Sequence, residues 1–401
     1  MRRFISLVLS SCVLLTLAGC HKPLKAPVDT TSTQVESVPI RDHTLPTIPD
    51  IDTPMQIPMI SVSMPIIREP ELAKDGTEIF NYIYQNMSLI LPEQEIADRI
   101  IVDFLNRIDK TAVDAEAIKT AAKTDYTNGN RTPYLCQITY EPMRIDSGVL
   151  SLFGRYATYS GSSHPDSVEL SVNYNLLTGH VMQLDAIIDP THKSMLVFEI
   201  IQALNRQKEE KYLFEDFENI VKDRFASDFS HENDWYFSNT GLCFYFSAYD
   251  IAPYSSGVIV AEIPYERLTG LMNDAYFPAE RMDAKGTLSA SLFHDNLLDD
   301  FDTFSEVILD KGSAKALLHT DSIIYDVRIE IGSWSADGSA FIPEYTVYAA
   351  NALSSGDAIV VESEIPDTLP HLRINYRSNG KTVRYFLTDS GNDGGILLIQ
   401  G

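Results

Sequence analysis

Cysteine is scarce in this sequence, which has four among 401 residues. A chain of this length buries a large core, so it does not need disulfide bonds for stability. No apolar run reaches the roughly 18 residues of a membrane-spanning helix. Basic residues are also scarce, since 31 face 56 acidic ones and the net charge is −25. This balance argues against nucleic acid and anionic lipid headgroups as partners, and it fits either a cationic partner or simple solubility.

Several motifs that carry chemistry are missing as well. The sequence has no phosphate-binding loop, nucleophile elbow, HExxH helix or EF-hand loop. The acidic residues 295–302 lack a glycine to bend a calcium cage and favour a solvated helix start, and the glycines of 388–395 favour a plain turn. Residues 378–381, Ser-Asn-Gly-Lys, have the spacing of serine-lysine enzymes, but Asn-Gly between strand-like runs predicts a type I′ hairpin. We expect no metal, no cofactor and no catalytic residues.

The first feature that is present is an apolar N-terminal segment. Arg2 and Arg3 precede the apolar run 4–17, which is too short to span a bilayer and is typical of a signal peptide. The run ends in Leu-Ala-Gly-Cys, which resembles the lipobox of bacterial lipoproteins and implies a signal peptide of residues 1–19 with lipid attachment at Cys20. The alternative is an ordinary secretory signal with a chance cysteine. Two acyl chains on Cys20 would anchor the chain at the extracytoplasmic face of the bacterial membrane.

Composition divides the rest of the chain into four segments. Residues 20–56 are rich in proline and threonine and predict an extended tether. Residues 57–190 and 191–283 combine strand-like runs with helical patterns, and they predict two α+β subdomains with antiparallel sheets and helices on one face. Short strand-like runs between turns in 284–401 predict a small all-β, sandwich-like domain.

Helices are expected in three places. Isoleucine, leucine and phenylalanine recur at helical spacing in 92–123, and a second helical region is expected at 193–225. A shorter helix is expected at 292–309. Cys136 and Cys243 lie in apolar strand-like runs, so they either pair in an oxidising compartment or remain buried free thiols.

Three segments together resemble one family. They are 83–108, with its strand-then-helix opening, 159–188, with "YSGSSHP" before a strand and a "TG" hairpin, and 244–268, with "YDIAPYSSG" followed by "IPY". Across 57–275 the chain resembles the extracytoplasmic domain of RsiV-like lysozyme-sensing anti-sigma factors, which also precedes the catalytic domain of PdaC-like peptidoglycan deacetylases. The sigma-binding segment, the membrane span and the deacetylase metal ligands are not found here.

The resemblance therefore implies only the shared ectodomain, whose role in the RsiV-like branch is to bind lysozyme. We expect a non-catalytic surface lipoprotein that binds a protein or cell-wall ligand, with a cationic lysozyme-like protein as one candidate partner. An envelope scaffold is the alternative, followed by a cell-wall hydrolase or deacetylase with an unrecognised site. The candidate ligand-binding residues are Ser162, Ser163, His164, Pro253, Tyr254 and Ser255.

His164 and the segment from Pro253 to Gly257 each have a structural interpretation as well as a functional one. His164 lies between small residues and a proline, so a loop histidine is favoured over a catalytic base. Pro253 to Gly257 interrupt an apolar stretch, because proline cannot donate to a sheet and glycine can take a positive φ. This interruption is either a shaped turn with Tyr254 against the sheet or a rigid contact surface at the end of a strand.

Overall fold

The fold is α+β, as expected, in the computed structural model of the chain. The predicted signal peptide, Cys20, the tether and Ser163 lie outside the described residues. Residues 55–401 form one unit. Among the described residues, no helix has both the length and the apolar character needed to cross a membrane. The structure describes residues 57–401, apart from 163, 228, 230–233, 280, 282–283, 367–369 and 391–394.

A five-stranded sheet forms the first layer, in the order β2-β3-β5-β6-β7. Neighbouring strands are antiparallel except β3 and β5, which are parallel and are joined through helix α1, Gln94–Thr127. This arrangement follows from the chain order, because parallel neighbours need a crossover connection. The strands are Ile66–Leu72 (β2), Glu78–Gln85 (β3), Tyr134–Ile145 (β5), Val149–Tyr159 (β6) and Asp166–Asn175 (β7).

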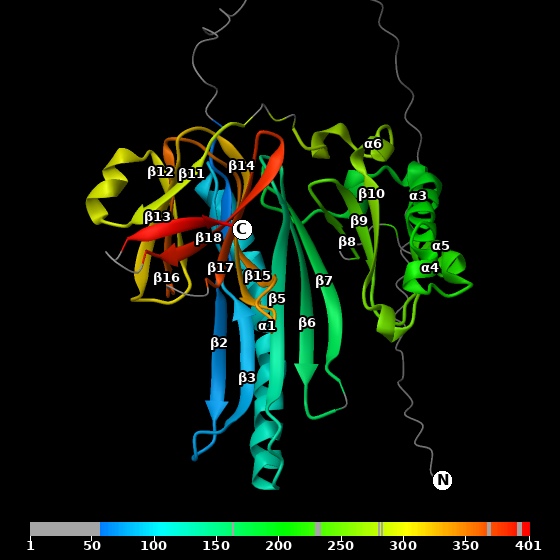
Figure 1. Ribbon diagram of the computed structural model, residues 1–401. Coiled ribbons are helices and arrows are strands. Elements are labelled where there is room, and N and C mark those ends of the chain that lie inside the picture. Colours follow the sequence, from blue (N-terminus) through cyan, green and yellow to red (C-terminus); the bar gives the residue numbers. More distant parts are fainter. Residues whose placement is uncertain are drawn as a thin grey trace, which may run out of the picture. The chain divides into compact units, whose positions relative to one another are not determined.

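Helix α1 confirms the expected helix at 92–123. Ile100, Phe104 and Ile108 recur every four residues and are buried, so they form the stripe that faces the five-stranded sheet. The ring of Phe104 meets that of Tyr140 on β5 edge-on, with 5.4 Å between the ring centres. Figure 1 shows α1 lying along this sheet.

A three-stranded sheet, β10-β9-β8, forms the second layer. On β9, Leu242, Phe244 and Phe246 belong to the core with the helices, whereas Cys243 and Tyr245 pack on the opposite face with residues of β5 and β6. Helix α3 packs on β10, and Figure 1 shows α3 and α5 beyond this sheet. The elements are Lys193–Asn205 (α3), Phe217–Ser227 (α5), Trp235–Phe237 (β8), Gly241–Phe246 (β9) and Ile259–Pro264 (β10).

The expected helical region at 193–225 is divided between three helices, α3, α4 and α5. Further short helices lie in the connections of this layer. The short α-helices are Leu184–Ile187 (α2), Lys208–Lys211 (α4) and Tyr265–Leu268 (α6). The 3₁₀ helices of the chain are Pro190–His192 (η1), Tyr254–Ser256 (η2), Asp274–Tyr276 (η3) and Asp295–Asp300 (η4).

Two sheets enclose the C-terminal core, in agreement with the expected sandwich. One has the order β11-β13-β16-β12, and the other β19-β18-β17-β14-β15-β1-β4. The strands are Ser61–Ser63 (β1), Ser88–Ile90 (β4), Leu288–Leu292 (β11), Thr303–Ile308 (β12), Ala314–Thr320 (β13), Ile324–Trp334 (β14), Phe341–Leu353 (β15), Asp357–Ser363 (β16), Leu372–Ser378 (β17), Lys381–Asp389 (β18) and Ile396–Gln400 (β19).

The seven-stranded sheet contains strands from both ends of the described chain. Strand β1 pairs with β15 and β4, and the backbone N–H of Ile60 donates to the side chain of Asn351 at 2.9 Å. Arg328 on β14 also donates to the carbonyl oxygens of Pro142 and Met143 on β5, the second at 2.9 Å. The segment boundaries at 190 and 283 stay predictions. Strands from both sides of residue 283 share this seven-stranded sheet.

The expected helix at 292–309 is wrong. Its first part is the end of β11 and the single 3₁₀ helix η4, and its second part is strand β12, which pairs in parallel with β16. Ser305 and Val307 of β12 are buried, while Phe304 and Ile308 are exposed. This alternation has period two, so the pairing partner β16 outweighed the local helical pattern.

Two local predictions are settled by the backbone. Ser378 and Lys381 face each other across a two-residue turn, in which Asn379 and Gly380 have φ values of 52° and 70°. Two successive positive φ values fit the type I′ hairpin. Of the two interpretations of Cys136 and Cys243, the buried free thiols are the correct one.

Candidate functional site

The loop from Ser247 to Gly257 is held in place by charged side chains. The N–H of Asp250 donates to the Ser247 carbonyl at 3.0 Å and closes a tight turn. The Asp250 carboxylate accepts from the Ser247 N–H and from Arg224, both at 3.0 Å. The Ser247 hydroxyl donates to buried Glu169 on β7 at 2.6 Å. These contacts fix the loop against β7, the edge strand of the five-stranded sheet.

Tyr249 lies at the third position of this turn with a φ of 74°. This is the left-handed region, which disfavours a residue with a Cβ and usually holds glycine in such turns. The side chain is 65% exposed, so packing in the core does not account for its backbone conformation. Residues kept in this conformation tend to occur at functional sites, where neighbouring contacts hold them.

The second half of the loop presents Tyr254. Pro253 precedes the 3₁₀ helix η2 with a φ of −61°, and Gly257 ends it with a φ of 66°. Nothing lies within 4 Å of a Cβ built on Gly257, so the glycine is needed for its φ and not for space. Ser255 is exposed, and the Tyr254 side chain is 43% exposed.

His164 meets Tyr254 across the space between the two loops. Their rings are stacked with centres 5.0 Å apart and an interplanar angle of 30°. Tyr254 also contacts Tyr249, with ring centres 5.5 Å apart. The Ser162 hydroxyl donates to the carbonyl oxygen of His164 at 2.6 Å, so it shapes the histidine loop. Three aromatic rings therefore form one exposed row.

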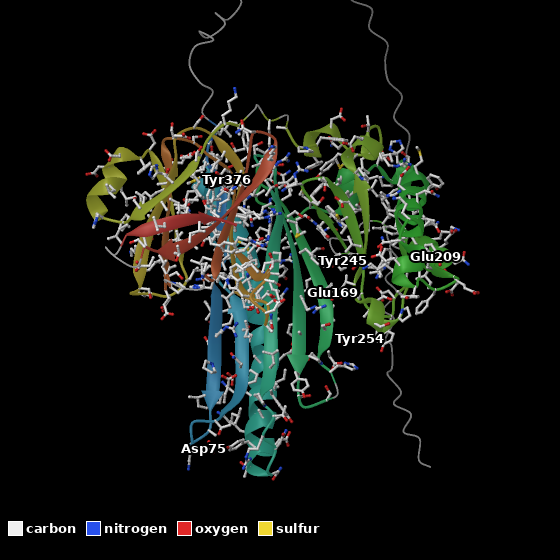
Figure 2. The ribbon with its side chains drawn as sticks, viewed as in Figure 1. Asp75, Glu169, Glu209, Tyr245, Tyr254 and Tyr376 are labelled. Atoms are coloured by element: carbon white, nitrogen blue, oxygen red, sulfur yellow. The ribbon has the colours of Figure 1, made fainter. Side chains whose placement is uncertain are left out.

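A groove of about 240 Å³ lies beside this aromatic row. His164, Tyr249 and Tyr254 line it together with Tyr156 of β6 and Asp166 of β7. Asp166 is the one aspartate, glutamate, lysine or arginine among the described residues that line the groove, and it is exposed. Figure 2 shows Tyr254 on the loop that joins β9 and β10.

Tyr156 belongs to the groove and to the core beneath it. Its hydroxyl donates to Asp114 of α1 at 2.9 Å. Burial, reinforced by this hydrogen bond, raises the pKa of Tyr156. The Tyr156 ring is therefore held in place by its hydrogen bond, and its hydroxyl stays protonated at ordinary pH.

The structure brings together some of the predicted site residues. His164 and Tyr254 touch through their rings, and Ser162 acts indirectly by holding the His164 loop. Pro253 and Ser255 flank Tyr254 but do not line the groove. The sequence reasoning missed the groove residues Tyr156, Asp166 and Tyr249. Tyr249 could have been predicted from the sequence, because it begins the same "YDIAPY" stretch that contains Tyr254.

A second set of aromatic and charged residues is buried between the layers. Arg144 at the end of β5 is 2% exposed and pairs with Asp146 at 2.6 Å. It also donates to the Tyr265 hydroxyl at 2.8 Å and to the Tyr276 carbonyl at 2.7 Å. Its guanidinium lies over the rings of Phe237 and Tyr265, 5.2 and 5.4 Å from their centres. This is the buried arginine cluster.

Within the described residues, no three His, Cys, Asp or Glu side chains come together as a metal ion would require. The groove offers stacking surfaces and one carboxylate. Such a set can hold a ligand by ring contacts and charge.

Residues 185–266 match the model of one protein family, described as a protein of unknown function, DUF3298. The match includes the loop with Tyr249 and Tyr254, and it ends before strand β11. His164 lies outside it. This description is broader than the RsiV-like resemblance, which therefore stays a prediction.

Solved structures of DUF3298 family proteins are also similar to the chain. One from Bacteroides fragilis is 16% identical, with a TM-score of 0.39, and the alignment covers 54% of this chain and 94% of that one. One from Pseudomonas aeruginosa is also 16% identical, with a TM-score of 0.36 and coverage of 56% and 98%. None of the curated proteins matches the chain.

Proposed function

We propose that this protein is a non-catalytic, lipid-anchored protein of the outer face of a bacterial membrane that binds a protein or cell-wall ligand. The anchor is the predicted lipid on Cys20, and the ligand-binding surface is the exposed row His164–Tyr254–Tyr249 with its groove. A cationic, lysozyme-like protein is one candidate ligand, as the RsiV-like resemblance implies.

The observation that carries this proposal is the contact between His164 and Tyr254. The two residues come from separate segments that both carry the RsiV-like resemblance, and their ring centres lie 5.0 Å apart. The anchoring of the loop adds support, because hydrogen bonds of Ser247 with Asp250 and Glu169 hold it in one conformation. Exposed aromatic residues on a fixed loop are typical anchors of a binding surface.

The test uses the chain from residue 21 onward, which lacks the predicted signal peptide. Its binding to lysozyme is measured by pull-down and titration, and its binding to peptidoglycan sacculi by sedimentation, each at low and moderate salt. We expect Tyr254→Ala to weaken binding about tenfold, as for a central aromatic anchor. The fold should be retained, because this side chain is 43% exposed.

The matched control is Tyr212→Ala. Tyr212 is also an exposed tyrosine with a positive φ, but it ends helix α4 and does not line the groove. Binding should be unchanged in this variant. If the folded protein binds neither lysozyme nor sacculi at any salt concentration, the proposal fails. Stable protein partners found by cross-linking would then favour the envelope scaffold.

A further inference from the structure

We propose that the groove beside Tyr249 and Tyr254 is a subsite for one lysine or arginine side chain of a partner protein. This inference rests on the proposed function and names the chemistry of its ligand. The cation would lie against the exposed tyrosine rings and near the Asp166 carboxylate.

The rings supply the first part of such a site. Tyr249 is 65% exposed and Tyr254 is 43% exposed, and their centres are 5.5 Å apart. The face of a tyrosine ring is electron-rich and attracts an ammonium or guanidinium group within about 6 Å of its centre. The stack of Tyr254 on His164 keeps one ring from turning away.

Charge supplies the second part. Asp166 lines the groove, and none of the described lining residues is a lysine or arginine that would neutralise it. The carboxylate and the tyrosine rings favour a positive ligand and oppose a negative one. The net charge of −25 acts in the same direction at longer range, since it speeds the approach of cationic proteins.

The buried arginine cluster contains the same kinds of groups, two aromatic rings and an aspartate, with a cation already bound to them. Arg144 lies over two aromatic rings, those of Phe237 and Tyr265, and pairs with one aspartate, Asp146. In that cluster the chain supplies its own cation. The groove has exposed rings and an aspartate, and its described lining contains no lysine or arginine. A partner would supply the missing cation.

The size of the groove fits a side chain better than a larger ligand. Its volume is about 240 Å³, below the roughly 300–1,000 Å³ of sites that enclose drug-sized molecules. A glycan strand would extend far beyond it, whereas the end of a lysine or arginine side chain would fill it.

The experiment compares small probes that differ in charge. Nα-acetyl-lysine amide and Nα-acetyl-arginine amide are titrated into the chain from residue 21 onward, with Nα-acetyl-norleucine amide as the neutral probe. Binding is followed by NMR chemical shifts of labelled tyrosine rings. We expect both cationic probes to bind about tenfold more tightly than the norleucine probe and to shift the Tyr249 and Tyr254 signals.

Variants locate this binding. Tyr254→Ala should weaken the cationic probes about tenfold, and Asp166→Asn should weaken them about threefold. Asp166 is exposed at the start of β7, so Asp166→Asn keeps the test valid if the tyrosine variant fails to fold. Tyr212→Ala should bind the probes as the unchanged protein does. Equal binding of the norleucine and lysine probes would overturn the inference.

The outcomes separate this inference from the proposed function. If lysozyme binding is lost in Tyr254→Ala but neither cationic probe competes for it, the cation subsite is wrong and the binding function stands. If the cationic probes bind at the groove but neither lysozyme nor sacculi bind, the subsite stands and the proposed function fails.

Discussion

The exposed groove and the buried arginine cluster contain similar residue types in opposite environments. Arg144 is 2% exposed, and each of its contacts is made within the protein. Tyr249 and Tyr254 are 65% and 43% exposed, and one face of the row is open to solvent. The same chemistry therefore stabilises the fold in one place and is available to a ligand in the other.

Solvent access is the reason for the difference. A buried charge is tolerated only when its donors and its partner are satisfied, so the buried arginine cluster allows little change. The groove instead keeps a backbone conformation that costs stability, the positive φ of Tyr249. The first region is therefore held by satisfied internal contacts, and the second combines exposed rings with a backbone conformation that disfavours a Cβ.

The largest expected effect is on the buried arginine cluster. Arg144→Met should lower the free energy of unfolding by about 3 kcal/mol, because it leaves the Asp146 carboxylate without its cation and the Tyr276 carbonyl without its donor. Urea unfolding followed by circular dichroism measures this loss.

The control for this variant is Arg267→Met. Arg267 also pairs with a carboxylate, Glu199, at 2.6 and 2.7 Å, but its side chain is 50% exposed. Arg267→Met should lower the free energy of unfolding much less than Arg144→Met does, since exposed ion pairs contribute little to stability. Equal losses in the two variants would remove the distinction between buried and exposed clusters.

A second prediction concerns alkaline pH. Tyr245 is 2% exposed, and burial raises its pKa from 10.0 to about 12. The folded state therefore favours the protonated phenol, and this contribution to stability is complete below pH 10 and is lost as the pH rises towards 12. At pH 11 the loss from Tyr245 is about 1.4 kcal/mol. Urea unfolding measures the free energy of unfolding at pH 8 and at pH 11. Between these pH values, Tyr245→Phe should lose less stability than the unchanged protein. Equal losses would contradict the raised pKa of Tyr245.

The smallest effect tests the strain at the groove. Tyr249→Gly should raise the free energy of unfolding by about 0.5 to 1 kcal/mol, because glycine adopts a φ of 74° without steric conflict. It should also weaken ligand binding several-fold. Tyr212→Gly, at a φ of 52° away from the groove, should gain similar stability and leave binding unchanged. Unchanged or stronger binding by Tyr249→Gly would contradict a role of the ring in binding.

Much of the fold could be predicted because its local patterns agree with its contacts. The apolar stripe of α1 and the Asn-Gly hairpin at 379–380 appear in the structure as expected. The helix at 292–309 failed because strand β12 depends on its partner β16, which lies about fifty residues later. The pairing of β1 with β15 could not be predicted for the same reason.

The candidate site was predicted only as separate residues. His164 and Tyr254 came from two loops that resemble one family, but nothing in the sequence places one ring on the other. Arg144 gave no signal, because it sits in a strand-like run and its partners Tyr265 and Tyr276 lie more than a hundred residues away.

The sequence by itself determined the α+β class, the main helix, the acidic character of the chain and the loops that contain His164 and Tyr254, because these depend on composition and short-range spacing. Only the tertiary structure decided which aromatic residues face solvent and which surround Arg144. Burial and ring contacts arise between segments far apart in the chain. The packing of the three-stranded sheet on the five-stranded sheet therefore created both the buried arginine cluster and the open groove.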